Sequence, residues 1–263
     1  MSTTSEGARD PGAPDVAEPG RPSFSDAYRE LARARKGRGR GAPAYSLYVN
    51  RPLGRVFAAG AVSVGWGPNT VSLVSAGFTF TAIALIATVP PSPISGVVIA
   101  LLLVVGYALD SADGQVARFT HGGSAAGEWL DHVLDACKNC AIHLAVLVSA
   151  FRWFDLPPAW LLVPIAFAVV SSTTFAAMVL KDLLPTVGRS GTRPSGSGRP
   201  STPARSLLGL PTDYGVLCLS LALLGWPAAF WFVYVLLCIA HAAYLLLAGP
   251  KWFRDLTRRI EAE

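Results

Sequence analysis

Long apolar runs are the feature that most limits how this chain can fold. Hydrophobic residues make up 52% of the sequence and charged residues only 15%, against roughly 25% charged residues in soluble domains. A helix needs about 20 apolar residues to cross a bilayer, and six runs approach that length: 70–89, 92–109, 133–151, 158–180, 207–225 and 227–248. The sequence therefore predicts an all-α integral membrane protein with six transmembrane helices.

Polar segments flank these runs at both ends. We expect a short helix over residues 24–36 with Ser25 as its N-cap. Residues 45–64 mix aromatic, arginine and small apolar residues, which predicts an interfacial amphipathic helix on the cytoplasmic side before the first span. The expected organisation has three parts: residues 1–44, a disordered cytoplasmic region; residues 45–248, the six-span domain; and residues 249–263, a cytoplasmic tail.

The positions of lysine and arginine predict the orientation. They concentrate in the N-terminal region, the 110–130 connection, the 181–206 loop and the C-terminal tail, whereas the three opposite connections contain only Arg152. Because cytoplasmic loops carry the excess of basic residues, we expect a multi-pass protein of the cell membrane with both termini cytoplasmic. The net charge of +5 is better explained by anionic lipid headgroups than by nucleic acid, because the basic residues lie between apolar runs.

The chemistry concentrates between residues 110 and 135, where four of the eleven aspartates of the chain lie. Asp110 and Asp113 are three residues apart at the end of the second run, and Asp131 and Asp135 are four apart at the start of the third. Both spacings place a pair on one helix face, and two helices joined by a short loop are neighbours. We therefore expect the four carboxylates to converge on the cytoplasmic side.

Four carboxylates that converge repel one another and favour cations. Oxygen ligands prefer hard ions, which indicates magnesium, with manganese or calcium as alternatives. Four carboxylates can hold two ions, and such a pair suits displacement at phosphorus because it stabilises both the attacking and the leaving oxygen. The residues thus predict metal-assisted phosphoryl transfer. A purely structural cluster is less favoured, because four acids would share two bases, Arg118 and Lys138.

The same stretch resembles the CDP-alcohol phosphotransferase pattern. That pattern is D, two residues, DG, two residues, AR, eight residues, G, three residues, D, three residues, D. Every fixed position is present at the right spacing: Asp110, Asp113, Gly114, Ala117, Arg118, Gly127, Asp131 and Asp135. The resemblance covers roughly residues 45–248 and includes the six-span architecture.

The resemblance implies a role for each matching residue. Asp110, Asp113 and Asp131 would be metal ligands, and Asp135 both a ligand and the general base, with two magnesium ions as cofactors. Gly127 would let the second and third spans pack closely. The residues implied near the CDP-linked donor are Asn69, Thr70, Gly114, Arg118 and Ser124.

The implied reaction moves a phosphatidyl group from a CDP-linked lipid, foremost CDP-diacylglycerol, to the hydroxyl of a small polar alcohol. CMP is released, and phospholipid biosynthesis is the expected setting, with a homodimer as the expected assembly. Arg205, Asp213 and Lys138 are candidate acceptor-binding residues, and arginines of the 181–206 loop favour a phosphorylated acceptor such as inositol phosphate or glycerol phosphate. Lys138 either contacts a phosphate or offsets the carboxylates.

The rival hypothesis is a non-enzymatic transporter of divalent cations that uses the acids as its binding site. Transporters place such sites near the bilayer midplane, often at broken helices in paired repeats. Here the acids lie at the ends of spans and no repeat is evident. The sequence therefore favours the enzyme, while the acceptor alcohol and the exact CDP-linked donor stay open.

Overall fold

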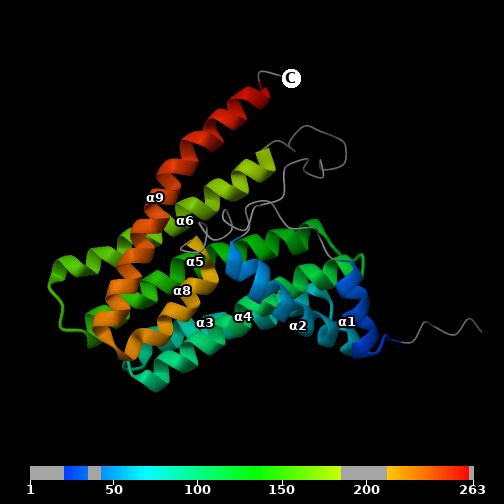
Figure 1. Cartoon of the computed structure of the whole chain (residues 1–263), viewed down its shortest axis with the longest axis horizontal. Coiled ribbons are helices and arrows are strands. Elements are labelled where there is room, and N and C mark those ends of the chain that lie inside the picture. Colours follow the sequence, from blue (N-terminus) through cyan, green and yellow to red (C-terminus); the bar gives the residue numbers. More distant parts are fainter. Residues whose placement is uncertain (1–20, 35–42, 185–211, 261–263) are drawn as a thin grey trace, which may run out of the picture.

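Figure 1 shows the computed structural model of the chain, which describes residues 21–34, 43–184 and 212–260. All regular structure in these ranges is helical. The elements, in chain order, are α1 (Phe24–Arg33), η1 (Ser46–Asn50), α2 (Arg51–Val64), α3 (Pro68–Thr88), α4 (Pro93–Phe119), α5 (Ala125–Trp153), η2 (Pro158–Leu161), α6 (Leu162–Leu183), α8 (Tyr214–Ser220), η5 (Leu221–Gly225) and α9 (Pro227–Ile260).

Five helices of the described part are long and apolar enough to cross a membrane: Pro68–Thr88, Pro93–Phe119, Ala125–Trp153, Pro158–Leu183 and Pro227–Thr257. They confirm an all-helical, multi-pass membrane protein. The predicted fifth span, 207–225, begins outside the described residues, and its described portion is a shorter apolar helix, Tyr214–Gly225. The count of six therefore stays a prediction.

The helices that carry the acids extend beyond the apolar runs. α4 continues to Phe119 and α5 already begins at Ala125, so the predicted 110–130 connection is reduced to residues 120–124. Hydropathy marks where a helix meets polar surroundings, whereas the backbone continues while its residues favour helix. All four aspartates therefore lie on helices, which fixes their spacing around each helix axis.

Polar caps define where several helices begin. Ser92 and Ser95 form a capping box at the start of α4, and Ser124 caps α5. The N-cap of α1 is Ser23, whose hydroxyl accepts from the backbone N–H of Asp26 over 3.3 Å. The prediction of Ser25 is wrong, because Ser25 lies within the first helical turn.

Small residues allow close helix crossings around α4. A Cβ on Gly106 would meet Thr79 Oγ1 of α3 and approach the Ser75 carbonyl oxygen at 3.3 Å. A Cβ on Gly54 of α2 would lie 2.9 Å from the Ala108 carbonyl oxygen of α4. Such contacts stabilise membrane helices through van der Waals packing. α4 is thereby held between α2 and α3, and its acidic end is fixed in place.

The N-terminal helices cover one flank of this arrangement (Figure 1). Residues 46–64 are helical and form η1 and α2. α1 buries Ala27 and Leu31 in a cluster that also contains Ala58 and Val62 of α2 and Val116 of α4. The position of α2 at the membrane surface stays a prediction.

Candidate functional site

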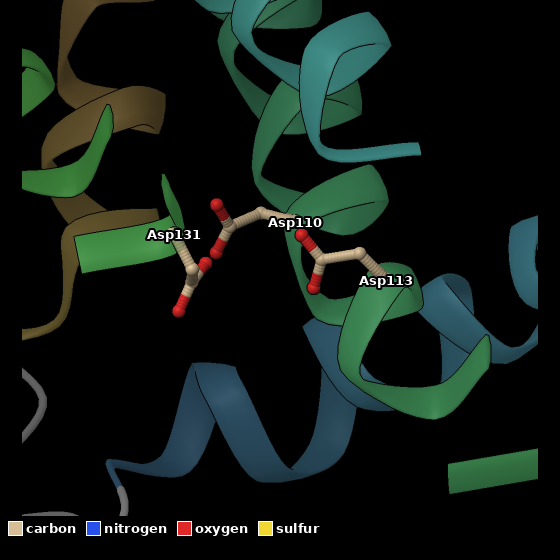
Figure 2. Close-up of side chains that lie close together, drawn as sticks. All are labelled: Asp110, Asp113 and Asp131. Carbon is tan, nitrogen blue, oxygen red and sulfur yellow. The ribbon is translucent and has the colours of Figure 1, made fainter. Parts of the chain in front are cut away.

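Three carboxylates from α4 and α5, two helices that both pack against α3, converge. Asp110 and Asp113 come from α4 and Asp131 from α5, and each offers an oxygen such that all three lie within 4.8 Å of one another. Figure 2 shows the three carboxylates pointing toward a common space. Asp113 is buried, at 7% exposure, whereas Asp110 and Asp131 are partly exposed. The predicted convergence thus holds for these three aspartates.

The fourth aspartate reaches the cluster through a lysine. Nζ of Lys138 lies 2.7 Å from Oδ1 of Asp135 and 2.5 Å from Oδ1 of Asp110. Lys138 is itself only 5% exposed. Lys138 was predicted either to contact a phosphate or to offset the charge of the carboxylates, and these two ion pairs support the second role.

A serine that the sequence reading missed holds Asp113. The Ser72 hydroxyl of α3 donates a hydrogen bond of 2.5 Å to Oδ2 of Asp113, and both groups are buried. Ser72 lies three residues after Asn69, so it shares a helix face with it. A polar residue on that face, one turn into an apolar helix, was the signal available in the sequence.

Two of the residues predicted near the donor, Asn69 and Ser124, come together around Gly127 at the starts of α3 and α5. A Cβ on Gly127 would lie 2.9 Å from Oδ1 of Asn69 and 3.3 Å from Oγ of Ser124. The Ser124 hydroxyl also accepts the Gly127 N–H over 3.0 Å as the cap of α5. The expectation that Gly127 serves packing between the second and third spans needs correction, since its close neighbour belongs to α3, the first span.

The last turns of α4 present an accessible surface. A Cβ on Gly114 would have only Arg118 Nη1 within 4 Å, at 3.4 Å. Arg118 is exposed and forms no ion pair with any described residue. A guanidinium without a carboxylate partner beside open backbone suits an anionic ligand. Asn69 and Thr70, at the start of α3, are also exposed.

The remaining candidates have different surroundings. Arg205 lies outside the described residues. Asp213 is 2% exposed, and its two carboxylate oxygens accept the backbone N–H groups of Gly215, at 3.0 Å, and Ser46, at 2.9 Å. It therefore caps α8 and ties that helix to η1, and its acceptor role stays a prediction.

The chemistry of this donor set fits a hard divalent cation. Its ligand atoms are carboxylate oxygens, the type that magnesium and manganese prefer. Among the described residues, the ammonium of Lys138 is the only cation paired with the four aspartates, so an excess of negative charge remains at the α4–α5 junction. Such an excess near an apolar environment is stabilised by bound cations.

Comparison with known proteins gives the family. The family model for CDP-alcohol phosphatidyltransferase matches residues 66–243. A curated relative, the CDP-diacylglycerol–serine O-phosphatidyltransferase of Encephalitozoon cuniculi (strain GB-M1), is 36% identical over 69 residues. That match spans 26% of this chain and 17% of the length of the relative.

A solved structure shares the fold. It is the phosphatidylinositol phosphate synthase of Mycobacterium tuberculosis with CDP-DAG bound, which matches with a TM-score of 0.50 at 21% identity. The match covers 76% of this chain and 90% of that one. The family model extends over more than half of the sequence and includes all four aspartates, so the chain belongs to the CDP-alcohol phosphatidyltransferase family of transferases.

Proposed function

We propose that this protein transfers a phosphatidyl group from a CDP-linked lipid, foremost CDP-diacylglycerol, to the hydroxyl of a small polar alcohol and releases CMP. The observation that carries the proposal is the convergence of Asp110, Asp113 and Asp131 within 4.8 Å in a chain of this family. The named substrates of the two relatives add support, because both names refer to CDP-diacylglycerol.

The acidic residues would divide the work at the reacting phosphate. Asp110, Asp113 and Asp131 would hold magnesium or manganese, together with Asp135 if a second ion binds. The bound metal would supply charge stabilisation for the diphosphate and for the oxygens that develop charge. Ser72 would keep the buried Asp113 carboxylate in its ligating orientation through their hydrogen bond.

Asp135 would act as the general base. Lys138 holds its Oδ1, which leaves Oδ2 to accept the proton of the acceptor hydroxyl. The hydroxyl oxygen then forms a bond to the phosphorus that bears the lipid, the bond from that phosphorus to the bridging oxygen breaks, and CMP leaves with the electron pair.

The donor would lie along the exposed ends of α3, α4 and α5. Arg118 would bind phosphate oxygens by paired hydrogen bonds, and Gly114 would allow close approach to the backbone. Asn69, Thr70 and Ser124 would face the nucleotide, because Asn69 and Ser124 both lie against Gly127, about one helical turn before Asp131 on α5.

The relatives indicate the identity of the acceptor alcohol less clearly than that of the donor. One relative is named for serine and the other for phosphatidylinositol phosphate, so similarity favours no single alcohol. We propose a phosphorylated alcohol, with Arg205 as the phosphate-binding residue, because Lys138 and Asp213 are already paired within the fold. Arg205→Ala should then raise the KM for the acceptor far more than that for the CDP-linked lipid.

The proposed setting is the cell membrane, with both termini and the acidic cluster facing the cytoplasm. We further propose a homodimer, as the family resemblance implies, and residues 45–248 as the catalytic domain. A purified protein that runs as a monomer in detergent and in nanodiscs while fully active would contradict the dimer.

The direct test is CMP release by the purified protein with magnesium, CDP-diacylglycerol and a panel of alcohols. The panel should pair each phosphorylated acceptor with its free alcohol, such as glycerol phosphate with glycerol. Faster CMP release with the phosphorylated member would support the acceptor proposal. No release with any CDP-linked donor would contradict the transferase and favour cation transport.

A further inference from the structure

The ammonium of Lys138 occupies an unusual place among the acids. It bridges two helices, because it contacts Asp110 of α4 at 2.5 Å and Asp135 of its own helix, α5, at 2.7 Å. At 5% exposure it lies inside the protein. A divalent ion shared between these two carboxylates would lie close to the ammonium, so lysine and metal compete for the same electrostatic position.

Burial makes this lysine difficult to displace. A buried ammonium that leaves its partners loses their attraction and must find other hydrogen-bond acceptors. Lys138 follows Asp135 by three residues, so the helix itself holds the two side chains on one face. Arg118, by contrast, is exposed and unpaired among the described residues. The charge of Lys138 is therefore a resident part of the acidic cluster.

The charge balance indicates how the ammonium of Lys138 affects the binding of divalent ions. Four ionised aspartates and one lysine carry a formal charge of −3, which one divalent ion reduces to −1. A second divalent ion would bring the sum to +1 and place a metal against an ammonium, and like charges at close range repel strongly in a low dielectric. An anionic ligand would offset that charge, and the diphosphate of the proposed donor is one.

We propose that Lys138 is a positioning residue that makes the two predicted metal positions unequal. In the chain without substrate, one divalent ion binds at Asp110, Asp113 and Asp131, and the ammonium of Lys138 keeps a second ion from the Asp110–Asp135 pair. The second ion enters together with the anionic donor. This inference rests on the metal dependence in the proposed function.

The test counts bound Mn²⁺ on the purified full-length protein by the electron paramagnetic resonance signal of the free ion, without substrate. The wild-type chain should bind one equivalent tightly and a second at least tenfold more weakly. Lys138→Met should bring the second affinity to within about threefold of the first. Lys181→Met removes a lysine that pairs with Asp182 at 3.3 Å and should leave the isotherm unchanged.

A charge-balanced pair of variants covers the case in which Lys138→Met does not fold. Asp135→Asn retains the lysine against Asp110, whereas Lys138→Met with Asp135→Asn removes one charge of each sign. The double variant should bind its single Mn²⁺ at least threefold more tightly than Asp135→Asn, because the competing ammonium is gone.

The outcomes separate this inference from the proposed function. A wild-type chain that binds no Mn²⁺ would overturn both. If the wild-type chain binds Mn²⁺ but the lysine variants leave every affinity unchanged, the metal dependence stands and the role of Lys138 is overturned. Two equally tight ions in the wild-type chain would likewise overturn the inference alone.

Discussion

Ser72 and Asp113 form a hydrogen bond of 2.5 Å between α3 and α4, inside the protein. Asp113 is the most buried of the three converging aspartates, so the hydroxyl fixes a carboxylate that water does not orient freely. The bond also connects the helix that begins with Pro68 and Asn69 to the helix that carries two of the acids. This hydrogen bond therefore links the helix proposed to contact the CDP-linked donor with the helix that carries two of the proposed metal ligands.

Removal of this hydroxyl should weaken catalysis without unfolding the protein. A hydrogen bond to a charged group contributes about 1.5–3 kcal/mol, so Ser72→Ala should lower the rate of CMP release on the order of tenfold and raise the magnesium concentration needed for half-maximal activity. Ser75→Ala is the matched control, since Ser75 donates to the Gly106 carbonyl oxygen instead. Equal losses in both variants would assign the effect to helix packing.

The three converging aspartates should each be indispensable. Asp110→Ala and Asp131→Ala should abolish CMP release, because loss of one ligand leaves the remaining carboxylates poorly neutralised and the diphosphate misplaced. Asp182→Ala removes an exposed aspartate on α6 and should retain activity. Excess EDTA should abolish CMP release by the wild-type protein, and added magnesium or manganese should restore it. Full activity in EDTA would contradict the metal site.

Sequence patterns were sufficient for the five long apolar helices and for the three aspartates that converge. Apolar runs report on the surroundings of a helix, and the 3.6-residue period places Asp110 beside Asp113 without any knowledge of the fold. They could not show that Ser72 reaches Asp113 or that Gly127 faces Asn69. Both contacts join residues more than 40 positions apart, and the crossing of whole helices decides them.

The sequence also did not predict the exact residue at which a helix begins, for a related reason. Ser23 and Ser25 are both good capping residues, and the one that caps α1 is set by where the chain enters the helix. The role of Lys138 likewise depended on distance, since the sequence allowed it to meet either a phosphate or a carboxylate. Only the arrangement of α4 and α5 in space brings it to Asp110.

Asp135→Asn should separate binding from turnover. The amide cannot accept the acceptor proton, so kcat should fall by about a hundredfold or more, while the Kd for the CDP-linked lipid changes little. Lys138 then retains Asp110 as a partner, which should preserve the fold and keep the Tm close to that of the wild-type protein. A variant with more than about a tenth of wild-type turnover would contradict the general-base role.

Gly127→Ala should act on the donor side of the site. The new Cβ would lie 2.9 Å from Oδ1 of Asn69, so the asparagine must shift, and the KM for the CDP-linked lipid should rise several-fold with a smaller effect on that for the acceptor. Gly123→Ala is the control, because a Cβ there meets nothing within 4 Å. Unchanged donor kinetics in Gly127→Ala would remove Asn69 from the donor site.

The last prediction concerns how α5 crosses the membrane. α5 has 29 residues, or about 43 Å at 1.5 Å per residue, which exceeds the roughly 30 Å hydrocarbon core. Its two ends should therefore face opposite compartments, with the aspartates on the cytoplasmic side if basic residues mark that side. Asp155, which is exposed and follows the C-cap residue Phe154, should then lie outside.

Single cysteines can test this in intact cells. All four native cysteines should first be replaced with alanine, namely Cys137, Cys140, Cys218 and Cys238, and the variant checked for CMP release. Asp155→Cys should react with a membrane-impermeant maleimide added outside, whereas Ser195→Cys, in the predicted cytoplasmic loop, should react only after the cells are permeabilised. If both cysteines are labelled from the same side, an even number of crossings separates the two positions and the predicted topology is wrong.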